Sequence, residues 1–241
     1  MSRRRKGWKA LSVLRSLLGV ALAPTAVAAV FTAAAALGGL SSRLPGTVYF
    51  LSAFAGYSLL HALRFLTLYR FYVFAHELTH ALAAWALGGK VFALAVGKQS
   101  GHVDLSRTNA FIALAPYWVP FYSLLAVAAY RMVLWWGSPP YARETFLALM
   151  GATLAFHFAH TIEALWTTHQ SDLDEAGFPL SISSIVLLNG LLLLAAVKCL
   201  FPHAVSFADG LRQMGAITAL FWGGAAGLLH KGGTWAVSAV R

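Results

Sequence analysis

The chain has 241 residues, of which 59% are hydrophobic and only 11% are charged, and its mean hydropathy is +0.68. Because ordinary soluble domains carry about 25% charged residues, this composition excludes a soluble globular protein and predicts an integral membrane protein. The net charge of +10 does not indicate a nucleic-acid partner, since the basic residues are scattered at segment ends, apart from one N-terminal cluster.

That cluster is Arg3-Arg4-Arg5-Lys6, and it is typical of a cytoplasmic anchor beside anionic headgroups of a lipid bilayer. The first hydrophobic segment follows at residues 11–40. Within it, Ala26-Val27-Ala28 resembles a signal-peptidase site, so a cleaved signal peptide is an alternative to a retained transmembrane helix. The apolar run extends well beyond this point, which favours the retained helix.

A turn at residues 41–46 leads into a second hydrophobic region at residues 48–89. This region is long enough for two spanning helices of about twenty residues each. The break between them is predicted at residues 64–70, which places two arginines at one membrane face. We interpret His61, in the first of these helices, as a buried hydrogen-bonding group rather than as a metal ligand.

The second of these helices contains the run His76-Glu77-Leu78-Thr79-His80. Histidines four residues apart project from one face of a helix and can bind a single Zn²⁺ ion. Glu77 is then the candidate general base, which takes a proton from activated water and passes it to the leaving amine. A structural polar network between helices is the alternative, although ionisable groups at membrane depth are costly and indicate a functional site. Because Cys199 is the only cysteine, any metal must be held by His, Asp or Glu.

Residues 91–96 and 102–105 have a strand-like composition and flank a glycine-containing turn at residues 97–101. They predict a β-hairpin, and a plain extramembrane loop is the alternative. The edge of such a hairpin can pair with an extended substrate by strand addition. Val103, in the hairpin, and Asn109, just after it, are therefore candidate substrate-binding residues.

The next predicted span covers residues 109–130 and contains two prolines. Pro116 and Pro120 are expected to kink this helix or to open its backbone. A membrane tolerates such a break only where neighbouring helices or a cavity satisfy the freed backbone groups.

A fifth helix is predicted at residues 142–166, with His157, His160 and Glu163 spaced at i, i+3 and i+6. These side chains lie within reach of one face over two turns, so this polar stripe is expected to face protein rather than lipid. The helix leads into the acidic segment at residues 168–177.

A sixth span is predicted at residues 181–201, and residues 214–229 are apolar but short and rich in glycine. The latter segment predicts a weak seventh span or a re-entrant segment. The fold class expected from the sequence is therefore an all-α polytopic membrane protein. It has six or seven transmembrane helices and a short β-hairpin after the HExxH helix.

Four stretches carry a resemblance to the site-2 protease-like intramembrane zinc metalloproteases, in a bacterial branch: AHELTHALAAWALGGKV, SGHVDLSRTN, ALAPYWVPFY and QSDL. The resemblance extends from about residue 71 to residue 189. In that family an HExxH helix is followed by an antiparallel helix, and a third core helix ends in a motif whose aspartate completes the metal site. The resemblance implies a Zn²⁺ cofactor, with His76 and His80 as ligands and Glu77 as the general base.

The third metal ligand is expected to be Asp172, which lies 96 residues after His76 (172 − 76) and directly after the fifth helix. This spacing is close to that of compact family members. Since the hairpin and one antiparallel span intervene, the HExxH helix and the fifth helix are expected to run parallel, with their C-terminal ends on one membrane side. Asp174 and His157 are the alternative ligands. The family's usual Asn-Pro…Asp-Gly signature is absent, and Gln170-Ser171-Asp172-Leu173 stands in its place.

The resemblance implies an intramembrane zinc endopeptidase that cuts transmembrane protein substrates, as a multi-pass protein of a bacterial inner membrane. One alternative is a membrane zinc hydrolase of a lipid-linked substrate. Another is a non-enzymatic membrane protein that binds or transports metal through the polar stripe of the fifth helix. The chain is predicted to be a single domain, residues 1–241, with its metalloprotease-like core at residues 71–189 and peripheral segments at residues 11–70 and 200–241.

Overall fold

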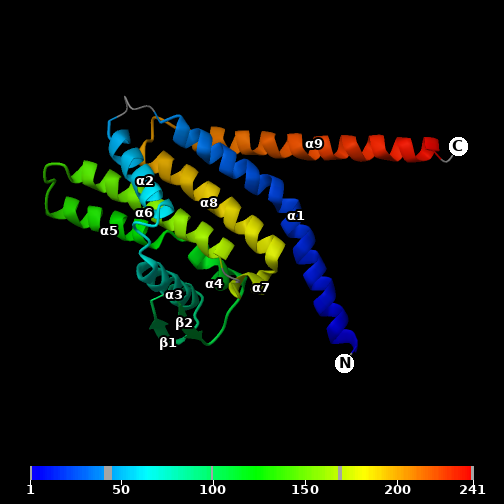
Figure 1. Cartoon of the computed structure of the whole chain (residues 1–241), viewed down its shortest axis with the longest axis horizontal. Helices are drawn as coiled ribbons and strands as arrows, with labels where there is room; N and C mark the ends of the chain where they lie inside the picture. The colour runs from blue at the N-terminus through cyan, green and yellow to red at the C-terminus, as the bar shows by residue number, and fades with distance from the viewer. Residues whose placement is uncertain (1, 41–44, 99, 168–169, 240–241) are drawn as a thin grey trace. The chain divides into compact units, whose positions relative to one another are not determined.

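The computed structural model describes residues 2–40, 45–98, 100–167 and 170–239 (Figure 1). The described chain is mostly helical and contains one two-stranded antiparallel sheet. It forms two compact units, residues 1–39 with 182–241 and residues 40–181. That the whole chain is a single domain stays a prediction.

Parts of three predicted features lie outside the described residues. They are residues 41–44 of the first turn, residue 99 in the hairpin turn and residues 168–169 of the acidic segment. The side chains of the N-terminal basic cluster, residues 3–6, also lie outside the described part of the chain.

Long helices make up the first unit (Figure 1). They are α1 (Ser2–Gly38), α9 (Phe207–Ala239) and most of α8 (Phe178–Leu200). α8 closely approaches α1 at Gly190, where an added Cβ would lie 2.8 Å from the backbone carbonyl carbon of Ala29. α1 continues unbroken past Ala26-Val27-Ala28, and its retention in the mature protein stays a prediction.

The second unit consists of shorter elements. They are α2 (Thr47–Ala62), α3 (Tyr69–Ala86), β1 (Val91–Val96), β2 (Gly101–Leu105), α4 (Ala110–Leu114), the 3₁₀ helix η1 (Ala115–Tyr117), α5 (Phe121–Trp136), α6 (Ala142–Thr167) and α7 (Asp172–Ala176). α2 and α6 pack backbone to backbone at Gly151, where an added Cβ would lie only 2.2 Å from the carbonyl oxygen of Phe50. The predicted break between α2 and α3 is confirmed, and two residues in it, Arg64 and Leu68, have left-handed backbone conformations with φ of 63° and 46°.

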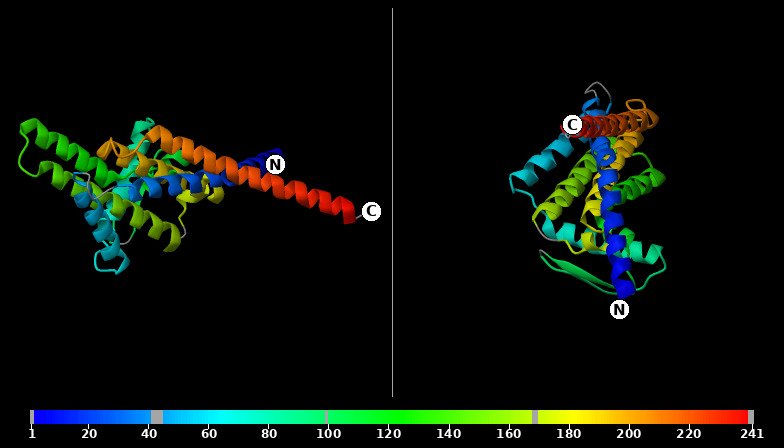
Figure 2. Two further views of the ribbon diagram at one scale, coloured as in Figure 1. Left: turned by 90° about the horizontal axis from the view of Figure 1, so that it is seen from above. Right: turned by 90° about the vertical axis from the view of Figure 1, so that its right-hand side faces the viewer.

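The predicted β-hairpin is confirmed. β1 and β2 pair antiparallel, with Leu94 opposite Val103 and Ala95 opposite His102. Both strands lie against α3, as Figures 1 and 2 show from several directions. The hairpin therefore follows the HExxH helix in the sequence and also borders it in space.

The proline-containing span is broken, as expected. α4 and η1 together bend by 71° relative to α5. Pro116 lies within the 3₁₀ helix and Pro120 precedes the first residue of α5, so neither proline removes a hydrogen bond from a regular α-helix. The fifth predicted helix is also confirmed, as α6.

Three helical segments of the described chain are long and apolar enough to cross a membrane: Leu11–Gly38 of α1, α6 and α8. The bent pair formed by α4–η1 and α5 brings this number to four if it counts as one broken span. The length and composition of these helices indicate a membrane protein. Six or seven spans would also need some of α2, α3 and α9, of which α9 contains the apolar segment at residues 214–229.

Candidate metal centre

Three side chains of the second unit converge on one point. α3 supplies His76 and His80, and Asp172 comes from the first position of α7. The Nε2 atoms of the two histidines lie 3.2 Å apart, and each lies 3.3 Å from Oδ2 of Asp172. The histidines share one helix face because they are four residues apart. Asp172 lies 96 residues after His76 and meets the histidines only in the folded chain.

The hydrogen bonds of the two imidazoles orient their Nε2 atoms toward this point. Nδ1 of His80 lies 2.9 Å from the carbonyl oxygen of Ile112, which can only accept, so Nδ1 donates, and in the neutral form of the ring that binds a metal Nε2 carries the lone pair. On His76, Nδ1 lies 3.3 Å from the hydroxyl of Tyr72. Such outer partners fix the tautomer of metal-binding histidines.

The donor set and its spacing fit Zn²⁺. With metal–ligand bonds of about 2.0–2.2 Å, the corners of a tetrahedral site lie about 3.3–3.5 Å apart. The three separations between His76, His80 and Asp172 are 3.2, 3.3 and 3.3 Å. Two imidazoles and a carboxylate are also a usual ligand set of catalytic zinc, with a fourth position left for substrate or water.

The Asp172 carboxyl is held in its ionised form. Burial raises its pKa, but hydrogen bonds and charge from His76 and His80 outweigh burial and bring the pKa well below its ordinary value. The hydroxyl of Tyr117, which is fully buried, donates to Oδ2 of Asp172 over 3.0 Å and lies equally close to Oε1 of Gln170. Tyr117 therefore positions the carboxylate as an anionic ligand.

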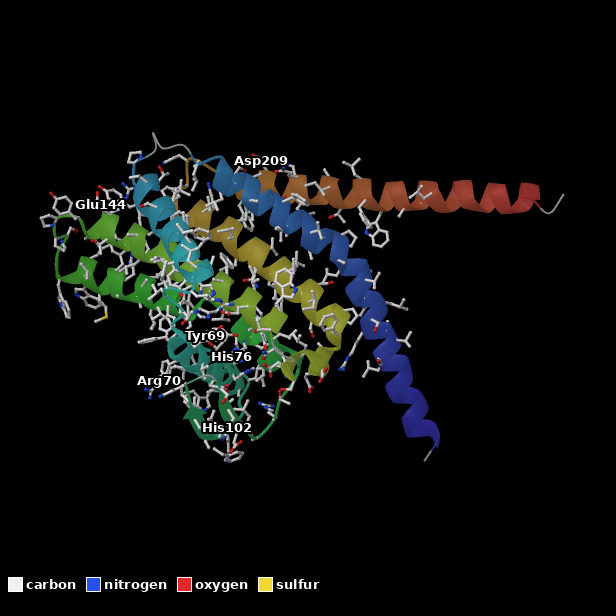
Figure 3. All side chains as sticks on the ribbon, viewed as in Figure 1. Tyr69, Arg70, His76, His102, Glu144 and Asp209 are labelled. Carbon is white, nitrogen blue, oxygen red and sulfur yellow. The ribbon has the colours of Figure 1, made fainter. Side chains whose placement is uncertain are left out.

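Glu77 is buried beside these three residues and lines two cavities. The larger cavity, about 560 Å³, is also bordered by β2 and by all three members of the cluster. The smaller one, about 300 Å³, extends from His76 and Glu77 toward α6. Figure 3 shows His76 on α3 and His102 on the hairpin, and both side chains border the larger cavity. Glu77 is therefore placed where a bound substrate would meet the cluster.

Gly101 leaves room for Glu77. A Cβ at this position would lie 2.7 Å from Cγ of Glu77 and 2.8 Å from Cγ1 of Val73. For the zinc peptidase expected from the sequence, the Gly101→Ala variant should therefore displace Glu77 and lower the rate of peptide cleavage by about a hundredfold without loss of zinc. Cleavage assays and zinc analysis test this, with Gly56→Ala as the control, because a Cβ at Gly56 meets nothing within 4 Å. Equal rates in the two variants would contradict the positioning role.

The structure separates Asp172 from the two alternative ligands. Asp174 and His157 belong to neither group of metal-binding side chains among the described residues. The imidazole of His157 borders a different, smaller cavity between α3, α5 and α6, which His76 also lines. Geometry thus favours Asp172 as the third ligand.

The two candidate substrate-binding residues have different surroundings. Val103 borders the larger cavity. Asn109 caps α4, since its side-chain oxygen accepts a hydrogen bond from the backbone N–H of Ile112. Substrate contact by either residue stays a prediction.

Sequence reasoning missed two tyrosines that orient the cluster. Tyr72 precedes His76 by four residues, so helical periodicity alone could have placed it on the same face of α3. No local pattern connects Tyr117 with Asp172, which lies 55 residues further along the chain.

Comparison of the chain with family models, curated proteins and solved structures finds no match. The family membership implied by the four sequence stretches therefore stays a prediction.

Proposed function

We propose that the chain is an intramembrane zinc-dependent endopeptidase of the site-2 protease-like family. The observation that carries this proposal is the triangle of His76, His80 and Asp172, whose three donor atoms lie 3.2–3.3 Å apart. Its edges match the ligand spacing of tetrahedral zinc. The buried Glu77 carboxyl and the larger cavity beside it supply the base and the space for substrate.

A Zn²⁺ ion in this site would act as a Lewis acid toward water and toward the carbonyl of a peptide bond. Glu77 takes the proton from the attacking water and passes it to the amide nitrogen as the C–N bond breaks. His80 is held by the carbonyl of Ile112, and Asp172 is held by Tyr117. These contacts fix the ligand positions before substrate binds.

The substrate class follows from the surroundings of the site. A peptide bond inside a helix is closed to attack, so the substrate is a transmembrane segment that has locally unwound. β2 borders the larger cavity through Gly101, His102, Val103 and Leu105. An extended substrate segment is proposed to add to the edge of β2, which holds its backbone next to Glu77.

We propose an inner-membrane protein of six or seven spans with a cytoplasmic N-terminus. α1, α6, α8 and the bent α4–α5 segment are long and apolar enough for four of these spans. α2 and α3, and for a seventh span α9, supply the rest. The basic residues at the N-terminus favour the cytoplasmic side.

Removal of zinc tests the proposed activity. The purified chain in detergent is mixed with a reporter protein whose single transmembrane segment contains helix-breaking glycine and proline. We expect cleavage to stop after chelation and to return with Zn²⁺ but not with Mg²⁺, because nitrogen donors of this kind favour zinc. A reporter with an all-leucine segment is the control and should stay intact. Cleavage that persists in the fully chelated enzyme would contradict a zinc peptidase.

A proline in β2 tests the role of the hairpin. The Val103→Pro variant removes one backbone N–H and is expected to slow reporter cleavage at least about tenfold while zinc content stays unchanged. Val103→Ala keeps the N–H and is the matched control, so it should cleave at close to the wild-type rate. If the proline variant cleaves normally, strand addition to β2 is wrong.

A further inference from the structure

A second cluster of side chains of metal-binding type lies in the same unit, on helices other than the one that carries the HExxH motif. His61 comes from the end of α2, and His160 and Glu163 come from α6. Oε2 of Glu163 lies 3.1 Å from Nε2 of His61 and 3.9 Å from Nδ1 of His160. One donor atom from each of the three residues lies within 4.8 Å of the others.

Two of these donor atoms are buried and make no hydrogen bond of regular geometry, although Nε2 of His61 lies 3.1 Å from one of them. They are Nδ1 of His160 and Oε2 of Glu163, and the side chain of His160 is 0% exposed. The other ring nitrogen of His160 lies 3.3 Å from the hydroxyl of Tyr57, and the His160 ring also interacts with the backbone of Thr67. Nδ1 lies 3.9 Å from Oε2 of Glu163. Buried polar atoms without partners cost about 1–3 kcal/mol each, so native structures rarely contain them unless an ion or a water is bound.

The arrangement fits a divalent cation. Oε2 of Glu163 lies 3.1 Å from the His61 nitrogen and 3.9 Å from the His160 nitrogen. These distances lie on either side of the spacing of about 3.3–3.5 Å expected between ligand atoms of tetrahedral zinc. Two imidazoles and one carboxylate form the same donor set as the first cluster. Such a set selects zinc-like transition metals over Mg²⁺ or Ca²⁺, which prefer oxygen donors.

Arg64 also interacts with this cluster, and its positive charge affects the affinity for a cation. Its guanidinium pairs with Oε1 of Glu163, and the Arg64 side chain is 61% exposed. Arg64 pairs with Oε1, the hydroxyl of Tyr69 also hydrogen-bonds the Glu163 carboxylate, and Oε2 is the oxygen that lies near the histidines. The positive charge of Arg64 lowers the affinity for a cation, although solvent screens it.

We propose that His61, His160 and Glu163 form a second divalent-metal site, which binds Zn²⁺ and cross-links the end of α2 to α6. This site does not depend on the proposed peptidase activity. It lies beside the first centre: the ring of Tyr72 stacks on His160 with centroids 5.0 Å apart, and its hydroxyl lies 3.3 Å from Nδ1 of His76. A metal here would hold α6 in place against the residue that orients His76.

Zinc content per chain tests the site. The purified full chain is loaded with Zn²⁺, freed of unbound metal by gel filtration and analysed by mass spectrometry. We expect two zinc ions in the wild type, one in His61→Ala, one in His80→Ala and none in the double variant. His157→Ala, which removes another buried histidine from α6, is the matched control and should keep both.

The outcomes distinguish the two sites. One zinc that survives His61→Ala but not His80→Ala would overturn the second site and leave the first intact. One zinc that survives His80→Ala but not His61→Ala would support the second site and contradict the proposed peptidase centre.

Thermal unfolding covers the case in which His61→Ala does not fold. In His80→Ala, only the second site is left to respond to metal, so added Zn²⁺ should raise the Tm. Arg64→Gln removes the positive charge beside the second site. The His80→Ala/Arg64→Gln double variant should therefore show a larger rise in Tm with Zn²⁺ than His80→Ala alone. A Tm of His80→Ala that does not change with Zn²⁺ would overturn the proposal.

Discussion

Replacement of Glu77 by glutamine is expected to lower the rate of substrate cleavage by about a hundredfold to ten-thousandfold, the range that general acid–base catalysis contributes. Glutamine keeps the size of the side chain beside Gly101 but cannot accept a proton from water. Because Glu77 lies outside the triangle formed by His76, His80 and Asp172, zinc content should not change. Reporter cleavage and zinc content are measured on the same preparation.

A second glutamate-to-glutamine change, away from the candidate metal centre, separates the loss of the catalytic base from the loss of a negative charge. Glu144 lies in the first turn of α6, away from the metal centre, so Glu144→Gln removes the same charge and should cleave like the wild type. Cleavage by Glu77→Gln at the wild-type rate would show that Glu77 is not the base. Zinc loss in this variant would instead indicate that Glu77 is a ligand.

Asp172→Ala is expected to remove the zinc ion that His80→Ala also removes, and with it all cleavage. Substitution of outer-shell partners weakens zinc binding by about 10–100-fold, and loss of a direct ligand should exceed this. The alanine also leaves the buried hydroxyl of Tyr117 without its carboxylate partner. A zinc titration monitored by a competing chelator measures the change in affinity.

The alternative ligands provide the controls for this experiment. Asp174→Ala and His157→Ala should bind zinc as the wild type does, since neither side chain belongs to the cluster. Asp172→Asn keeps an oxygen near Tyr117 but loses the negative charge, so its affinity should fall between wild type and alanine. Full zinc binding by Asp172→Ala, with loss in one of the other two variants, would show that the third ligand was assigned wrongly.

Local patterns in the sequence were sufficient to predict the elements that surround the site. The break between α2 and α3, the β-hairpin and the kink near Pro116 and Pro120 all occur where the sequence predicts them. The hairpin and the kink depend on residues close together in the chain: strand-like composition with turn-forming glycines, and prolines without an N–H. The break was predicted from the length of the hydrophobic region and the arginines within it. The number of spans was harder to predict, because α2 and α3 are short and only three or four helical segments pass as spanning ones.

The sequence by itself determined that one helix face carries His76 and His80 with Glu77 beside them, because helical periodicity acts over four residues. Only the tertiary structure decided which of Asp172, Asp174 and His157 joins them, since that depends on how the chain turns after α6. Likewise, His61 and Glu163 lie 102 residues apart in the sequence (163 − 61) and meet through the packing of α2 against α6. Contacts between distant segments depend on which helix faces pack together, and no local pattern specifies that choice.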